Sequence, residues 1–325
     1  MPRPECEIDM AAPARLPQLS PELFLTDGGL ETTLIFHEGF DLPDFAAFTL
    51  LDSVAGRLAL ERYYVAYLAI AARHGTGLVL ETPTWRASAD WGKRLGYSAA
   101  ALRAVNIAAV EQLRALRDSH AQGQPSVVIS GNLGPRGDGY SPTTVMTPEE
   151  SAAYHSEQIR ALADGGAELI TALTITHVGE AIGIVRESVE HGMPIVISFT
   201  VETDGTLPSG QPLEAAIAEL DAATAAGAAY LMVNCAHPTH FADVLEPHSS
   251  AFERIRGIRG NASMLSHAEL DEADELDAGD PVALATHYRD LLAMLPNLSI
   301  LGGCCGTDDR HIDAIAAACA PLLPR

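Results

Sequence analysis

Hydrophobic positions along the chain follow two alternating patterns. Short runs that are apolar at nearly every position end in Gly, Asn, Thr or Cys, and longer Ala- and Leu-rich amphipathic stretches follow them. A run that is apolar throughout is typical of a parallel strand buried on both faces, whereas a half-exposed antiparallel strand would alternate. The pattern therefore predicts repeated strand–helix units around a parallel sheet.

Eight such units can be placed on the chain. The expected strands cover residues 23–26, 77–81, 126–130, 168–172, 195–199, 230–234, 255–259 and 298–301. The expected helices cover residues 54–74, 99–121, 148–165, 178–191, 212–226, 240–252, 281–295 and 308–318. Thr147 before Pro148 and two glutamates is typical of a helix start, and Gly75 and Gly192 are typical of helix ends.

The number of units indicates the fold. Eight strand–helix units in about 300 residues match a (β/α)8 barrel. An open doubly wound sheet usually carries Gly-x-Gly-x-x-Gly after its first strand, but residues 27–31 here read Asp-Gly-Gly-Leu-Glu. We therefore predict the α/β class, with a single TIM-type barrel at 23–325 and an irregular N-terminal arm at 1–22. An acidic run at 269–280 is expected to be a solvent-exposed loop that could cover the barrel mouth.

Charge and composition exclude several partners. The chain of 325 residues has 20 Lys and Arg against 43 Asp and Glu, a formal net charge of −23. Such a chain is repelled by nucleic acid and by anionic membrane surfaces. No apolar run reaches the roughly 18 residues of a membrane helix, and acids and prolines stand where a signal peptide would be apolar. We expect a soluble, cytoplasmic protein, and leave homo-oligomerisation open.

Three of the cysteines fall where a barrel builds its active site. The chain contains Cys6, Cys235, Cys304, Cys305 and Cys319. An odd, sparse set of this kind does not predict a disulfide framework. Cys235 ends the sixth strand, and the pair at 304–305 follows two glycines after the eighth. Because carboxyl ends of barrel strands meet at one mouth, and glycines let the backbone bend, the three sulfurs could converge.

Three converging thiolates would bind Zn²⁺ with one position open, which is the pattern of a catalytic zinc site. Two other interpretations apply to these residues. The cysteines could be three small buried hydrophobic residues. The adjacent pair could be redox-active, although adjacent cysteines rarely form a stable disulfide because the ring is strained.

Together, three segments resemble the homocysteine S-methyltransferase family. They are Asp-Gly-Gly at 27–29, Val-Asn-Cys at 233–235 and Gly-Gly-Cys-Cys-Gly at 302–306. The resemblance covers about residues 23–320. It implies a zinc-binding (β/α)8 barrel, in agreement with the number of strand–helix units.

The resemblance also implies a reaction and its participants. A thiol such as homocysteine would complete the zinc site formed by Cys235, Cys304 and Cys305, and would accept a methyl group, a step of methionine biosynthesis. The partners would then be a small-molecule thiol acceptor and a methyl donor. Because no cobalamin- or folate-binding module fits after residue 325, we expect the donor to be small and diffusible or to be carried by another protein.

The resemblance further assigns substrate-pocket residues. Asp27 would contact the substrate amino group or the donor cation, and Thr82 and Thr84 would form pocket walls. Trp85 could face a cationic donor or simply pack. Asn234 would donate a hydrogen bond to a ligating sulfur or orient its loop.

One position departs from the family. After the fourth strand the family carries a Glu that holds the substrate ammonium, but Leu173 stands there in this chain. A leucine cannot pair with an ammonium, and a buried unpaired ammonium is costly. Either Glu31 takes over the ammonium from the first strand, or the acceptor is a thiol without that group.

Two further functions remain open at this point. The same chemistry could act on a non-amino-acid thiol or selenol, or run as a demethylase-type reaction. A function of another class is a non-catalytic zinc-binding barrel. Zinc content does not separate these alternatives, whereas turnover with a panel of thiols and donors does.

Overall fold

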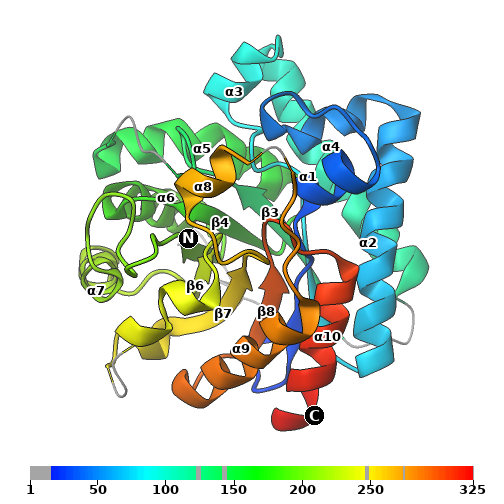
Figure 1. Cartoon of the computed structure of the whole chain (residues 1–325). Helices are drawn as coiled ribbons and strands as arrows, with labels where there is room; N and C mark the ends of the chain where they lie inside the picture. The colour runs from blue at the N-terminus through cyan, green and yellow to red at the C-terminus, as the bar shows by residue number, and fades with distance from the viewer. Residues whose placement is uncertain (1–15, 122–125, 141–144, 246–248, 274, 325) are drawn as a thin grey trace, which may run out of the picture.

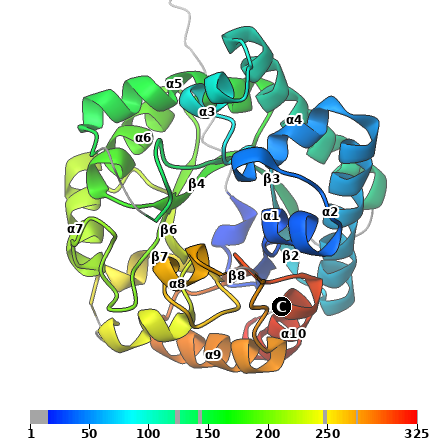
Figure 2. The ribbon, with the colours of Figure 1, turned by 45° about the horizontal axis from the view of Figure 1, so that its top comes forward.

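Eight parallel strands close into a barrel in the order β1 to β8 (Figures 1 and 2). The structure is a computed structural model that describes residues 16–121, 126–140, 145–245, 249–273 and 275–324. The strands are β1 Phe24–Leu25, β2 Gly77–Glu81, β3 Val127–Leu133, β4 Leu169–Ile175, β5 Ile195–Phe199, β6 Tyr230–Asn234, β7 Ile255–Gly260 and β8 Ile300–Gly303. Because β1 pairs with both β2 and β8, the sheet has no edge. The predicted TIM-type barrel is confirmed.

Helices surround the strands, as the view in Figure 2 shows. The long ones are α2 Val54–His74, α4 Ala99–His120, α5 Pro148–Gly165, α6 Val178–Glu190, α7 Leu213–Thr224, α9 Pro281–Met294 and α10 Asp309–Cys319. Shorter helices are α1 Leu30–Thr32, α3 Ala89–Arg94 and α8 His267–Asp271. The helix starts follow local chemistry: Thr147 and Glu150 form a capping box at α5. Gly75 ends α2 in the left-handed conformation, with φ 67°.

The helix expected at 240–252 is wrong. Among the described residues of that segment, which exclude 246–248, the structure has only short 3-10 turns, at Pro238–His240, Ala242–Val244 and Phe252–Arg254. Pro247 lies in the middle of the expected range, where proline lacks the N–H that a helix needs and clashes with the preceding turn.

The amino-terminal end of the barrel is filled by side chains. Phe24, Val79, Val128 and Tyr230 belong to one buried cluster at this end, and Leu16 packs with them. Part of the expected arm therefore contacts the barrel, while residues 1–15, including Cys6, lie outside the described residues. The division into an arm at 1–22 and a barrel at 23–325 stays a prediction.

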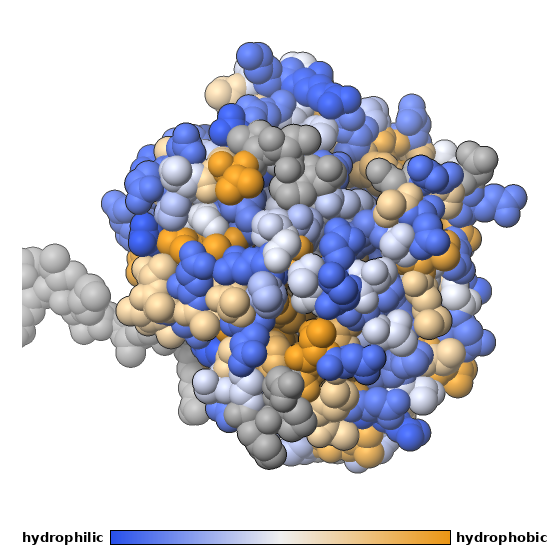
Figure 3. All heavy atoms as spheres, turned by 60° about the vertical axis from the view of Figure 1, so that its left-hand side comes forward, coloured by the Kyte–Doolittle hydropathy of each residue, from blue (hydrophilic) through white to orange (hydrophobic). Residues whose placement is uncertain are grey.

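The outer surface is mainly hydrophilic on the face drawn in Figure 3, where hydrophobic residues form separate patches. No helix in the described ranges combines the length and the apolar character that crossing a membrane would require.

Candidate functional site

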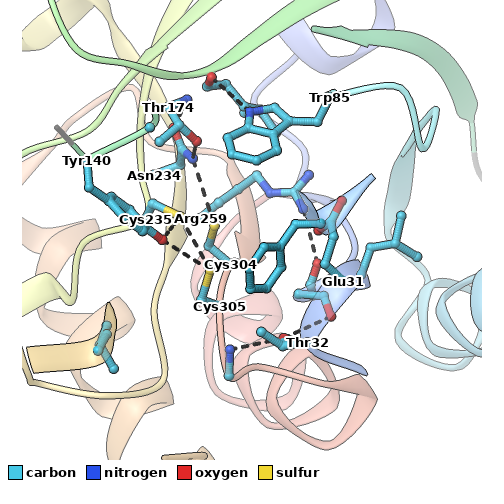
Figure 4. Close-up of a pocket in the computed structure, with 18 of the residues that line it drawn as sticks. Glu31, Thr32, Trp85, Tyr140, Thr174, Asn234, Cys235, Arg259, Cys304 and Cys305 are labelled. Carbon is cyan, nitrogen blue, oxygen red and sulfur yellow. Dashed lines mark hydrogen bonds between the residues drawn. The ribbon is translucent and has the colours of Figure 1, made fainter. Parts of the chain in front are cut away.

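A pocket of about 330 Å³ lies at the carboxyl ends of the strands. Its walls come from the carboxyl-terminal ends of β2, β3, β4, β6 and β7 and from the segments that follow β1, β2, β3, β6, β7 and β8. Figure 4 shows the labelled side chains pointing toward one another across this space. The acidic segment contributes Leu270, Ala273 and Leu276 to the lining. The expectation that this segment could cover the mouth is thus consistent with its position.

Cys235, Cys304 and Cys305 converge on one side of the pocket. Their Sγ atoms all lie within 4.8 Å of one another, and the sulfurs of Cys235 and Cys305 are 3.7 Å apart (Figure 4). All three are free thiols. Cys319 is buried in α10 and does not belong to the group.

Close packing of the backbone beside the cysteines explains why glycines stand at positions 302 and 303. A Cβ on Gly302 would lie 1.8 Å from Thr26 Oγ1, and one on Gly303 would lie 2.0 Å from Thr307 Oγ1. These two glycines are therefore needed for close approach. The bend that the sequence suggested comes instead from Gly306, with φ 78°.

Cys235 occupies an unusual conformation. Its φ is 57°, in the left-handed region that a cysteine rarely adopts. Its carbonyl accepts hydrogen bonds from Asn261 Nδ2 at 3.0 Å and from His267 Nε2 at 2.6 Å. These two hydrogen bonds stabilise the left-handed conformation of Cys235, which lies beside the other two cysteines.

The three thiols differ in how readily they ionise. Hydrogen bonds from Cys235 and Cys304 lower the pKa of Cys305, whereas hydrogen bonding to its neighbours raises the pKa of Cys235. Ionising all three thiols therefore requires a positive charge between them. Three soft sulfur donors beside an open pocket fit Zn²⁺ with one position left for a ligand.

Asn234 lies directly beside the sulfurs. Its Oδ1 accepts from the Thr174 backbone N–H at 2.8 Å and from the Ser198 hydroxyl at 2.6 Å. Its Nδ2 donates to Thr174 Oγ1 at 2.9 Å and is 3.9 Å from Cys304 Sγ. The amide is thus oriented by three short bonds with its N–H₂ toward Cys304.

Tyr140 is a pocket residue that the sequence analysis missed. Its hydroxyl lies 3.5 Å from Cys235 Sγ and 3.4 Å from Cys305 Sγ, and its ring stacks on His267 at 4.2 Å (Figure 4). It follows β3 in a loop with no recognisable motif, so only the folded chain brings it to the cysteines.

Arg259, also missed, forms a buried ionic cluster at the pocket. It pairs with Asp27 at 2.7 Å and with Glu81 at 2.5 Å, and its Nε donates to the Gly303 carbonyl at 3.0 Å. Asp27 also accepts from the Tyr63 hydroxyl at 3.1 Å. Burial raises the pKa of Glu81 to about 7 against the opposing charge of Arg259. Asp27 lines the pocket, but its carboxylate already has a cationic partner.

Glu31 and Leu173 line the same pocket. In the part of the chain that the structure describes, Glu31 forms no ion pair, and burial raises its pKa to about 7. Leu173 is 6% exposed, and its carbonyl accepts from Trp85 Nε1 at 3.3 Å. Glu31 is therefore a buried pocket carboxylate that has no ion pair with a described residue.

The two threonines after β2 differ in position. Thr82 lines the pocket, whereas Thr84 is fully buried and does not. Their hydroxyls bond to each other at 2.6 Å, and Thr84 also donates to the Asn132 carbonyl at 2.6 Å. The Thr84 hydroxyl is thus engaged in joining β2 to β3.

Comparisons with known proteins identify the family of this chain. The model of the homocysteine S-methyltransferase family matches residues 24–319. Homocysteine S-methyltransferase 4 of Zea mays is 25% identical over 320 residues, covering 90% of this chain and 88% of that protein. The methionine synthases of Mycobacterium leprae and Mycobacterium tuberculosis are each 30% identical over about half of this chain, and the match spans 14% of their length.

A solved structure shows the same fold. The metallated form of the homocysteine methyltransferase MmuM from Escherichia coli superposes with a TM-score of 0.72. It is 21% identical in sequence, with 91% of this chain and 96% of that chain covered.

Proposed function

Since the chain belongs to the homocysteine S-methyltransferase family, we propose that it is a zinc-dependent enzyme that methylates a thiol such as homocysteine. The observation that carries this proposal is the convergence of Cys235, Cys304 and Cys305 within 4.8 Å beside a pocket at the barrel mouth. Bound Zn²⁺ supplies the positive charge that keeps a substrate thiol ionised near neutral pH.

The residues of the chain have distinct parts in this reaction. The three cysteines would hold the metal, the oriented amide of Asn234 would support Cys304, and Tyr140 lies against the sulfurs of Cys235 and Cys305. The acceptor sulfur forms a bond to the methyl carbon as the bond from that carbon to the donor's sulfur or nitrogen breaks. The electron pair of the broken bond stays on the donor, and the acceptor's proton leaves to water.

The donor and the location follow from the same chemistry. We infer a small diffusible donor, or one carried by another protein, that enters the pocket at the barrel mouth. We infer a cytoplasmic location because the site requires free thiols, which a reducing compartment maintains. Leu173 at the family's Glu position favours, as a second candidate, the same transfer to a thiol without an amino group.

The test is zinc content and turnover across matched variants. Wild type and Cys319→Ala should each bind one zinc per chain, because Cys319 lies outside the cluster. Cys304→Ala should lose both zinc and methyl transfer, measured by elemental analysis and with a panel of thiols and methyl donors. Stoichiometric zinc and full activity in Cys304→Ala would contradict the site. Zinc binding without turnover on any pair would favour a non-catalytic barrel.

A further inference from the structure

Arg86 is a buried cation beside the pocket with an unusual environment. It follows β2, lines the pocket and is only 7% exposed. Its guanidinium carbon lies 4.1 Å from the ring centroid of Trp85 and 3.9 Å from that of Trp91. Its Nη1 donates to the Gly137 carbonyl at 2.8 Å. The guanidinium is thus held by two indole rings and one backbone bond.

Within the described ranges Arg86 forms no ion pair with a carboxylate, although the charge of Asp138, which also lines the pocket, acts on it more strongly than that of Glu31. Arg259, the other arginine that lines the pocket, pairs with both Asp27 and Glu81. Arg86 has no such ion pair, and its Nε is buried without a hydrogen-bond acceptor. A buried charge without a counter-ion is costly, so it requires a compensating partner. In a chain with 43 acids and 20 Lys and Arg, a shortage of acids does not explain the unpaired cation.

Glu31 presents the opposite charge to the same pocket. It has no protein cation as a partner in the described segments, and its charge acts on Arg86 without forming an ion pair. A guanidinium fork binds a carboxylate well because its N–H donors match the two oxygens. A pocket with an unpaired cation, an unpaired anion and a thiol site fits a ligand that carries complementary groups.

We propose that Arg86 binds the carboxylate of the acceptor, so that the substrates are thiols that carry a carboxylate. The proposal rests on the proposed function in taking a thiol as the acceptor. It does not depend on the ammonium, because homocysteine and its deaminated analogue both carry the carboxylate. Arg86 is thereby a residue that determines specificity.

The chain contains a built-in reporter for this site. Its two tryptophans are Trp85 and Trp91, and both contact Arg86. Intrinsic tryptophan fluorescence therefore follows ligand binding at the guanidinium. The zinc-loaded full chain is titrated with homocysteine, with 4-mercaptobutanoate, which lacks the ammonium, and with 3-mercaptopropylamine, which lacks the carboxylate. Titration calorimetry gives the same affinities independently.

Arg86→Gln should raise the half-saturating concentrations of homocysteine and 4-mercaptobutanoate by about ten- to a hundredfold. It should change that of 3-mercaptopropylamine by less than about twofold. Arg86→Lys should give an intermediate loss, because it keeps the charge but not the fork. Arg136→Gln is the matched control, since Arg136 lies over the Tyr154 ring at 4.7 Å and does not line the pocket. It should leave all three affinities unchanged.

Two results would overturn the proposal. One is wild-type protein that binds the decarboxylated thiol as tightly as homocysteine, a comparison that stands even if Arg86→Gln does not fold. The other is an equal loss for all three thiols in Arg86→Gln, which would indicate a purely structural role. Carboxylate-dependent binding without any methyl transfer would refute the proposed function, but it would still support Arg86 as the group that binds the carboxylate of a thiol ligand.

Discussion

At the scale of single residues, a substitution of Glu31 tests how an amine-bearing thiol is held. If its carboxylate receives the ammonium, Glu31→Gln should raise the half-saturating homocysteine concentration by about ten- to a hundred-and-fifty-fold, since such a contact contributes about 1.5–3 kcal/mol. The same change should barely affect 4-mercaptobutanoate. Steady-state kinetics with both thiols measures this, and efficient homocysteine turnover that is insensitive to Glu31→Gln would contradict it.

The pKa of Glu31 adds a pH dependence to this prediction. Burial raises that pKa to about 7, so the group loses its negative charge as the pH falls through this value. The ratio of the half-saturating concentrations of homocysteine and 4-mercaptobutanoate should therefore rise as the pH is lowered below about 7. The ratio removes effects common to both thiols. In Glu31→Gln it should be independent of pH.

At the scale of elements, the start of α10 supports the loop that carries Cys304 and Cys305. Asp308 caps this helix: its carboxylate accepts from the Arg310 backbone N–H at 3.0 Å, and its own backbone N–H donates to His311 Nδ1 at 3.1 Å. Asp308→Ala should lower the free energy of unfolding by about 1–2 kcal/mol, measured by urea denaturation. Asp309→Ala is the control, because Asp309 is exposed in the same turn and should change it by less than about 0.5 kcal/mol.

The contribution of Asp308 should also depend on pH. Burial raises its pKa, but hydrogen bonds from His311 and Arg310 outweigh burial and lower the pKa below its usual value. A carboxyl whose pKa is lower in the folded state stabilises the protein above its unfolded pKa of about 4 and loses this effect as the pH falls. The difference between wild type and Asp308→Ala should therefore be full at neutral pH and shrink below about pH 4. A difference that grows in acid would refute this.

At the scale of the whole molecule, the barrel should not depend on the metal for folding. Its strands close through backbone pairing around the whole ring, and buried hydrophobic residues pack inside and outside them. Removing zinc with a chelator should abolish methyl transfer and leave the far-UV circular dichroism nearly unchanged, unlike the behaviour of a zinc finger. Restoring zinc should restore activity. Loss of the dichroism on chelation would contradict the expectation.

The sequence alone determined the parts that depend on neighbours along the chain. Apolar runs located all eight strands, and caps such as Thr147 located helix starts, because periodicity and capping are local properties. The strand ends also placed Cys235 beside the pair at 304–305, since a closed barrel brings these ends to one mouth. The helix expected at 240–252 is wrong for a local reason too, because Pro247 stands in its interior.

Tertiary structure alone decided which side chains meet across the barrel. Arg259 reaches Glu81, 178 positions away in the sequence, and Asp27, which follows the first strand, so no local pattern marks the cluster. Tyr140 comes to the cysteines only when the loop after β3 packs over the mouth. Arg86 can be recognised as a buried cation without an ion pair only in the folded chain, where Trp85 and Trp91 flank its guanidinium. Such contacts form only when the barrel closes and side chains from distant segments pack together. The order of residues along the chain does not show either of these.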